Sequence, residues 1–121
     1  MEINDSKKGD VLILELVGRL DAATCNKLQE KITSLINVGE RTFLVDCYRL
    51  EYISSAGLRV FYRSANDLAP SGGRIAFCAL HPSVKNVFDV VDMVADFSIF
   101  AGREEAIRNL TSPSQGPSQG V

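Results

Sequence analysis

Two adjacent serines, Ser54 and Ser55, stand where an apolar segment gives way to a pattern of helical spacing. Hydroxyl groups at the start of a helix lie beside unpaired backbone N–H groups and the positive end of the helix dipole, which favours negative charge. With a helix that begins near Ser55, Arg59 and Arg63 follow at i+4 and i+8 on the side that the core-facing residues leave exposed. A phosphate on Ser55 would add a charge of about −1.5 to −2 beside this basic stripe without unfolding the domain. Ser55 is therefore a candidate phosphorylation site.

The serine pair also has a purely structural interpretation, because serine is among the preferred helix N-caps. The next two residues, Ala56 and Gly57, are small. Glycine lowers helix propensity where a better helix former would serve. We interpret this small pair as a sign that another surface approaches the helix closely at this point.

Residues that could support catalysis or bind a metal are few and scattered. The one histidine, His81, directly precedes Pro82, where a role at the start of a helix is the simpler interpretation. The three cysteines, Cys25, Cys47 and Cys78, lie far apart without metal-ligand or disulfide spacing, so we expect reduced thiols. The sequence contains neither a Walker A motif nor a dinucleotide-binding glycine motif. We therefore expect no catalytic residues, no metal and no cofactor, and a protein that is not an enzyme.

Asp46 ends an apolar segment, the position at which a phospho-accepting receiver domain carries its acceptor aspartate. A receiver domain also needs an acidic pair after its first strand and a lysine after a later strand. Here the first long apolar segment continues into Gly18-Arg19-Leu20-Asp21, and the later one ends in Ala79-Leu80. The sequence thus argues against a receiver domain.

The composition is that of one ordinary globular domain. The chain has 121 residues, of which 45% are hydrophobic and 23% charged, and its formal net charge is −2. This balance argues against direct binding to nucleic acid, which usually requires a basic face. No segment approaches the roughly 20 apolar residues needed to span a bilayer, and the acidic start is unlike a secretory signal. We expect a cytoplasmic protein without membrane insertion.

Strands and helices are predicted to alternate along the chain. Strands are expected at residues 11–17, 42–47, 74–80 and 97–100, with residues 1–5 as a hairpin partner of the first, and helices at 21–39, from 55 to about 69, from 81 and at 104–110. Asp21 or Thr24 is expected to cap the first helix and Gly39 to end it. This order predicts an α/β fold with a mostly parallel sheet of four to five strands and crossover helices. We assign residues 1–111 to one domain and 112–121, where the tetrapeptide PSQG occurs twice, to a flexible tail.

In this order and spacing, several short motifs together resemble the anti-sigma-factor antagonists of the STAS domain family. The likeness extends from about Val11 to Leu110. Its motifs are Gly18-Arg19-Leu20-Asp21, Phe43-Leu44-Val45-Asp46, Ile53-Ser54-Ser55-Ala56-Gly57-Leu58, Cys78-Ala79-Leu80-His81-Pro82-Ser83-Val84 and Phe88-Asp89. The resemblance implies a STAS-like fold.

The resemblance also implies a phosphorylation switch. The family's switch motif commonly has the order Asp-Ser-Ser/Thr-Gly-Leu, and alignment on Gly57-Leu58 places the phosphorylated serine at Ser55. Ser54 occupies the aspartate position, so the acidic neighbour is lost and Ser54 becomes the minor alternative acceptor. In the implied cycle the unphosphorylated protein binds a serine-kinase anti-sigma factor. Phosphorylation at Ser55 weakens that binding, and a metal-dependent serine phosphatase reverses it.

From geometry, the expected contact surface combines the serine segment, the exposed side of its helix and the adjoining loop: Ser54, Ser55, Ala56, Gly57, Arg59, Arg63, Gly18, Arg19 and Asp21. Two alternatives stay open. A STAS module that does not switch, and that binds a small ligand or serves in a transport or signalling complex, predicts that Ser55→Asp leaves partner binding intact. An enzyme predicts turnover that depends on His81.

Overall fold

The first two strands form an antiparallel hairpin at one edge of the sheet. The structure is a computed structural model that describes residues 1–90 and 97–111. β1 (Glu2–Lys8) pairs along its length with β2 (Val11–Leu20), and the turn between them holds Gly9 at φ +60°. Glycine adopts this left-handed conformation without steric cost. The predicted hairpin is confirmed, and both strands are longer than predicted.

The other strand pairs in the described residues are all parallel. The remaining strands are β3 (Thr42–Asp46), β4 (Leu50–Ile53), β5 (Arg74–Cys78) and β6 (Ser98–Phe100). Their order in the sheet is β1-β2-β3-β5-β6, while β4 pairs with the far end of β2 after a register shift between Gly18 and Arg19. The predicted α/β class with a mostly parallel sheet is confirmed.

β4 is a strand that the sequence did not predict, and with it the sheet formed by the described residues has six strands instead of four to five. It is only four residues long, with Leu50 and Ile53 buried and the two residues between them exposed. This pattern is too short to show the alternation by which a strand is recognised. Because β4 pairs with Gly18–Leu20, these three residues belong to β2 and not to the loop that was expected after it.

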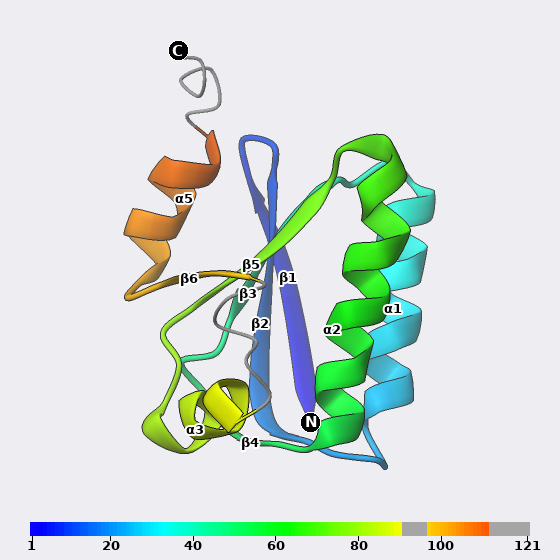
Figure 1. Cartoon of the computed structure of the whole chain (residues 1–121). Helices are drawn as coiled ribbons and strands as arrows, with labels where there is room; N and C mark the ends of the chain where they lie inside the picture. The colour runs from blue at the N-terminus through cyan, green and yellow to red at the C-terminus, as the bar shows by residue number, and fades with distance from the viewer. Residues whose placement is uncertain (91–96, 112–121) are drawn as a thin grey trace.

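Helices cover the two faces of the sheet unequally. The helices in the described residues are α1 (Cys25–Asn37), α2 (Ser55–Leu68) with a 3-10 turn (Ala69–Ser71), α3 (Pro82–Val90) and α5 (Arg103–Thr111). α1 and α2 lie side by side on one face, α5 lies on the other, and α3 sits near β4 (Figure 1). The four predicted helices are thus present. α1 begins at Cys25 with Thr24 in the N-cap position, the later of the two predicted starts, and the chain makes a turn at Asp21 before it.

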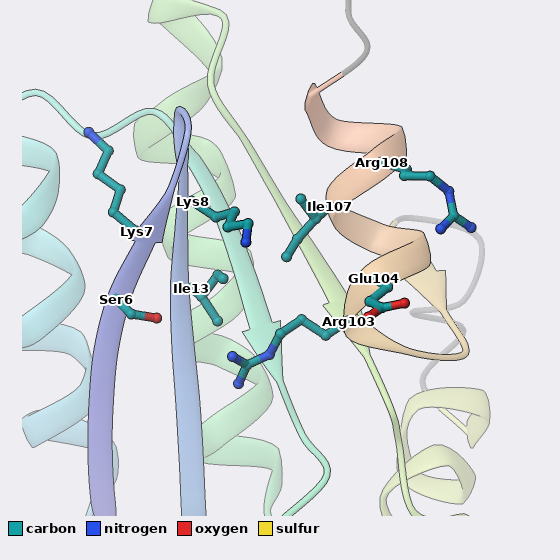
Figure 2. Close-up of a pocket in the computed structure, with 8 residues that line it drawn as sticks. All are labelled: Ser6, Lys7, Lys8, Ile13, Arg103, Glu104, Ile107 and Arg108. Carbon is teal, nitrogen blue, oxygen red and sulfur yellow. The ribbon is translucent and has the colours of Figure 1, made fainter.

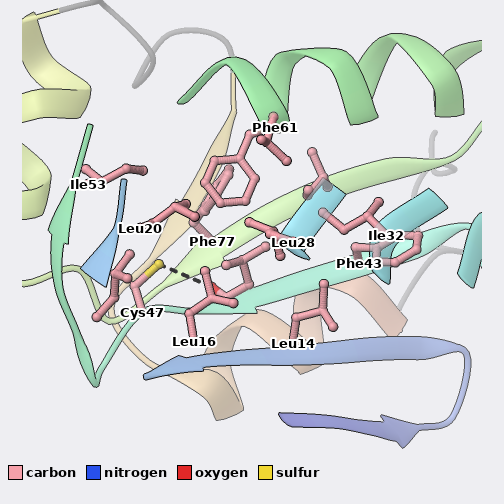
Figure 3. Close-up of a cluster of buried hydrophobic side chains, with 14 of the residues drawn as sticks. Leu14, Leu16, Leu20, Leu28, Ile32, Phe43, Cys47, Ile53, Phe61 and Phe77 are labelled. Carbon is pink, nitrogen blue, oxygen red and sulfur yellow. Dashed lines mark hydrogen bonds between the residues drawn. The ribbon is translucent and has the colours of Figure 1, made fainter. Parts of the chain in front are cut away.

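The core has two layers, separated by the sheet, and β2 supplies both. Leu12, Leu14 and Leu16 face the larger layer under α1 and α2, whereas Val11 and Ile13 face the smaller layer under α5. Figure 3 shows the larger layer, in which aromatic and aliphatic side chains from the sheet and the helices pack together. The alternation of side chains along a strand produces this division.

Two parts of the sequence prediction fall on residues outside the described ranges. The apolar face predicted for the third helix includes Val84 and Phe88, which are buried, and also Val91, which is outside them. The flexible tail predicted at residues 112–121 likewise lies outside the described residues.

Candidate functional site

The segment that carries the two serines is fixed to the sheet. The backbone N–H of Ser54 donates to the carbonyl of Leu20, the last residue of β2, at 2.9 Å. Ile53, just before it, is buried in the core. Ser55 is the first residue of α2. The serines therefore lie on a connection that is attached to β2 and to the core, at the β4 end of the molecule (Figure 1).

The two serines differ in their surroundings. The side-chain oxygen of Ser54 accepts a hydrogen bond from the backbone N–H of Gly57 at 3.3 Å, so Ser54 is the N-cap of α2 and is half-buried. Ser55 is exposed, and within residues 1–90 and 97–111 its hydroxyl forms no hydrogen bond. The capping interpretation thus accounts for Ser54 and leaves the Ser55 hydroxyl available for chemistry.

The small size of Gly57 is explained by the chain's own core. Gly57 is buried, and a Cβ atom at this position would lie 2.7 Å from Cγ of Leu20 and 3.1 Å from Cγ1 of Ile53. The close approach that the sequence suggested is therefore an intramolecular contact between α2 and the ends of β2 and β4. Gly57 supports the serine segment from inside the domain, because side chains of this chain bury it.

We expect Gly57→Ala to lower the free energy of unfolding by about 1–2 kcal/mol, because overpacking a rigid contact costs more than the gain in helix propensity returns. Urea denaturation measures the change. A Gly57→Ala protein as stable as wild type would contradict the packing argument.

α2 begins at Ser55, and Arg59 and Arg63 lie on the exposed side of this helix. Ser55, Leu58, Arg59 and Tyr62 line one shallow hollow of about 190 Å³. A second, of about 160 Å³, lies between α1 and α2 and is lined in part by Ala56, Arg59 and Arg63. Neither arginine forms an ion pair with another described residue. The predicted basic stripe is therefore exposed, and its charges are free to meet an anion.

The other predicted contact residues come from the end of β2 and the turn after it. Gly18, at φ +107°, donates its backbone N–H to the carbonyl of Arg49 at 3.0 Å. The Arg19 guanidinium lies 4.2 Å from the centre of the Tyr52 ring. Asp21 Oδ1 accepts the backbone N–H groups of Ala23 and Thr24 at 3.0 and 3.2 Å. Arg19 thus remains exposed beside β4, whereas Asp21 is engaged in the turn before α1.

The cap expected at the start of α1 differs in detail from the structure. Thr24 occupies the N-cap position, but its side chain makes no cap hydrogen bond. Its hydroxyl donates instead to the Arg19 carbonyl at 3.0 Å. Asp21 therefore supplies the acceptor for the turn, and Thr24 ties that turn back to β2.

Two exposed tyrosines close to β4 were not predicted from the sequence. Tyr48 and Tyr52 are 68% and 39% exposed, and they flank the buried residue Leu50. Exposed tyrosine and arginine side chains are enriched at protein–protein interfaces. The signal in the sequence was Tyr48 directly before Arg49, with Tyr52 three residues further on, but its meaning depends on β4, which was not predicted. We define the serine face as the exposed residues Ser55, Arg59, Arg63, Arg19 and Tyr52.

Three titratable groups, Asp46, Cys47 and Cys78, are buried in the core. Asp46 is buried, and its Oδ2 accepts two hydrogen bonds from the Arg103 guanidinium, at 2.9 and 2.7 Å. Burial, reinforced by the negative charge of Asp46, raises the pKa of the Cys78 thiol to about 12. Burial also raises the pKa of Cys47. Both cysteines are therefore neutral thiols at physiological pH, and thiols in this form are poor nucleophiles.

His81 also has a structural partner. Its Nε2–H donates to the backbone carbonyl of Tyr48, and its ring stacks on the Tyr48 ring with centroids 6.0 Å apart. These contacts join the β3–β4 connection to the start of α3. They match the position predicted for His81 at the opening of a helix.

Within the described ranges, no group of three histidine, cysteine or carboxylate side chains is arranged to hold a metal ion. No helix in the same part of the chain has both the length and the apolar character needed to cross a membrane.

Comparisons of the sequence with a family model and with a named relative agree with each other. The family model of the STAS domain matches residues 2–106. A Bordetella bronchiseptica protein named as an anti-sigma factor antagonist, BtrV, is 34% identical over 106 residues, which cover 88% of this chain and 91% of that protein.

Solved structures agree in fold. A Thermotoga maritima protein described as an anti-sigma factor antagonist superposes with a TM-score of 0.85 at 19% identity, over 89% of this chain and 93% of that one. The unphosphorylated form of the anti-sigma factor antagonist SpoIIAA gives a TM-score of 0.78 at 23% identity, over 89% and 95%. The phosphorylated form of SpoIIAA from Bacillus gives 0.72 at 22% identity, over 89% and 98%. The architecture is thus shared with structures of both phosphorylation states of that protein.

Proposed function

The chain belongs to the STAS domain family, and we propose that it is an anti-sigma-factor antagonist that acts in the cytoplasm by partner switching. In this proposal the unphosphorylated protein binds a serine-kinase anti-sigma factor through the serine face. The kinase phosphorylates Ser55, which weakens the complex, and a metal-dependent serine phosphatase restores the binding form. Residues 1–111 act as one STAS domain, in agreement with the match over residues 2–106.

The observation that carries the proposal is the division of roles between the two serines. Ser54 is occupied as the N-cap, whereas the Ser55 hydroxyl is exposed and without a partner among the described residues. Phosphorylation of Ser54 would convert the half-buried oxygen that accepts the Gly57 N–H into a phosphate ester, and this would disturb the cap hydrogen bond. Phosphorylation of Ser55 removes no contact. Ser55 is therefore the favoured acceptor and Ser54 the minor one.

The surroundings of Ser55 would stabilise a phosphate within the domain, while the charge of that phosphate would change the surface that a partner binds. Arg59 lies one turn further along α2 and has no ion pair within the described residues. The phosphate would also lie at the positive end of the helix dipole. The exposed arginines Arg19, Arg59 and Arg63 fit a partner surface that carries carboxylates. Added negative charge at Ser55 would neutralise part of this basic face and repel such a surface.

We expect the second pKa of phosphoserine at position 55 to lie below its ordinary value of about 6, because Arg59 and the helix dipole favour the dianion. A ³¹P NMR titration of the phosphorylated protein measures it. Arg59→Gln should raise this pKa by about 0.5 pH unit, corresponding to about 0.7 kcal/mol. Arg63→Gln, one turn further on, is the matched control and should raise it less. Equal titration curves for wild type and Arg59→Gln would show that Arg59 does not hold the phosphate.

Affinity capture from the protein's own cells tests the cycle. With Ser55→Ala as bait, we expect a complex that contains a serine kinase, because the variant cannot be phosphorylated at this position. With Ser55→Asp as bait, the kinase should be lost. If both variants retain the same partner, the domain is a STAS module that does not switch.

A further inference from the structure

A groove of about 460 Å³ lies between the β1–β2 hairpin and α5, on the face of the sheet opposite α1 and α2 (Figure 2). It is lined by Ser6, Lys7, Lys8, Ile13, Arg103, Glu104, Ile107 and Arg108. None of these residues belongs to the serine face. The groove is therefore separate from the site proposed for the partner.

The groove exists because α5 covers only part of its face of the sheet. In the part of the chain that the structure describes, α5 is the one helix packed on this face, and it contacts β2, β3, β5 and β6. Ile13 of β2 and Ile107 of α5 border the uncovered space, and both belong to the smaller core layer. The groove thus has an apolar floor that is continuous with the core.

Two cationic side chains approach this floor from opposite sides. Figure 2 shows Lys8 extending from the hairpin and Arg103 from α5 toward the space beside Ile13. Lys8 forms no ion pair within residues 1–90 and 97–111. Lys7 points away, and its ammonium lies 3.1 Å from Oε1 of Glu40. Lys8 therefore brings an uncompensated positive charge to the groove.

Arg103 is held in position before any ligand arrives. Its Nε and Nη2 both donate to Oδ2 of Asp46, a side chain that is 8% exposed, while the Arg103 side chain is 41% exposed. Asp46 Oδ1 in turn accepts the backbone N–H of Tyr48 at 3.0 Å. Nη1 of Arg103 has no hydrogen-bond partner within the described ranges. A guanidinium fixed on one side and open on the other is a preorganised donor for an anion.

We propose that this groove binds a small monoanionic amphiphile, a carboxylate with a short hydrocarbon chain. The carboxylate lies between Lys8 and Arg103, and the hydrocarbon lies against Ile13 and Ile107. The volume falls within the range of about 300–1,000 Å³ typical of ligand pockets. A monoanion fits better than a dianion because Asp46 already balances Arg103 and Glu104 also lines the groove. The site does not depend on the switch at Ser55.

The test is a ¹H–¹⁵N NMR titration of the full chain with hexanoate, and with 1-hexanol as the neutral molecule of equal chain length. We expect hexanoate to give saturable shifts at Lys8, Ile13, Arg103 and Ile107, and 1-hexanol to bind more weakly. Lys8→Gln should weaken hexanoate binding by about fivefold, as the loss of one exposed ion pair allows. Lys31→Gln is the matched control, since its ammonium pairs with Asp5 and the residue does not line the groove; it should change the affinity by less than about twofold.

Three results would overturn the proposal. Hexanoate could give no saturable shifts at the groove, or it could bind no better than 1-hexanol. Lys8→Gln could also behave like Lys31→Gln. Each would mean that the groove is only the part of the sheet that α5 leaves uncovered.

Discussion

Replacing Ser55 with aspartate should weaken binding to the serine-kinase anti-sigma factor by about a hundredfold. The new carboxylate would face a partner surface fitted to a neutral serine, and an unpaired charge buried at an interface costs about 2–5 kcal/mol. The fold should be unaffected, because an acidic residue is favourable in the first turn of α2. Isothermal titration calorimetry with the purified kinase measures the affinity, and urea denaturation confirms the fold.

Two controls separate the effect of position 55 from a general effect of charge. Ser55→Ala removes the acceptor without adding charge and should bind within about threefold of wild type. Ser6→Asp adds the same charge on the exposed edge strand β1, outside the serine face, and should also bind normally. If Ser6→Asp and Ser55→Asp weaken binding equally, net charge and not Ser55 governs the complex.

Arg103→Ala should lower the free energy of unfolding by about 3 kcal/mol, because it leaves the buried Asp46 carboxylate without its charge partner. The loss would loosen the attachment of α5 to the end of β3. Urea denaturation followed by circular dichroism measures the change.

Arg108→Ala is the matched control on the same helix. Arg108 is exposed and forms no ion pair within the described residues, so its loss should cost less than about 0.5 kcal/mol. Equal stabilities for the two variants would mean that the Asp46–Arg103 pair adds nothing to the attachment of α5.

Much of the fold could be predicted because its elements have clear periodicity. The spacing of Leu28 and Ile32 predicted α1, and both side chains are buried. The apolar positions that follow predicted a start of α2 near Ser55, and α2 begins at that residue. The turn at Gly9 likewise identified the β1–β2 hairpin. These features depend on local sequence, in which propensity and burial agree.

The features that were missed depend on contacts between distant segments. β4 is held by pairing with the end of β2, a partner more than thirty residues earlier in the chain. Without β4 there was no basis for placing Tyr52 beside Arg19. The Asp46–Arg103 pair joins residues 57 positions apart, and neither residue type nor spacing identifies it. The spacing of apolar residues along the sequence carries no information about such long-range pairs.

At the serine segment the sequence defined the candidates, and the geometry separated their roles. Ser54 and Ser55 were both possible caps or acceptors from their types alone. The hydrogen bond from Gly57 to Ser54 assigns the cap to Ser54. The contact residues predicted around the serines remain predictions, since they concern a partner. Among them, Gly57 is buried in the core, and the Asp21 carboxylate accepts hydrogen bonds within the turn before α1.

Site-mapping mass spectrometry of the protein isolated from its own cells tests the switch most directly. Spectra of the intact protein under several growth conditions give the phosphorylated fraction, and peptide fragmentation distinguishes Ser55 from Ser54. We predict a single phosphate on Ser55, present in some conditions and absent in others. A protein that carries no phosphate on Ser55 under any condition would contradict the proposed function.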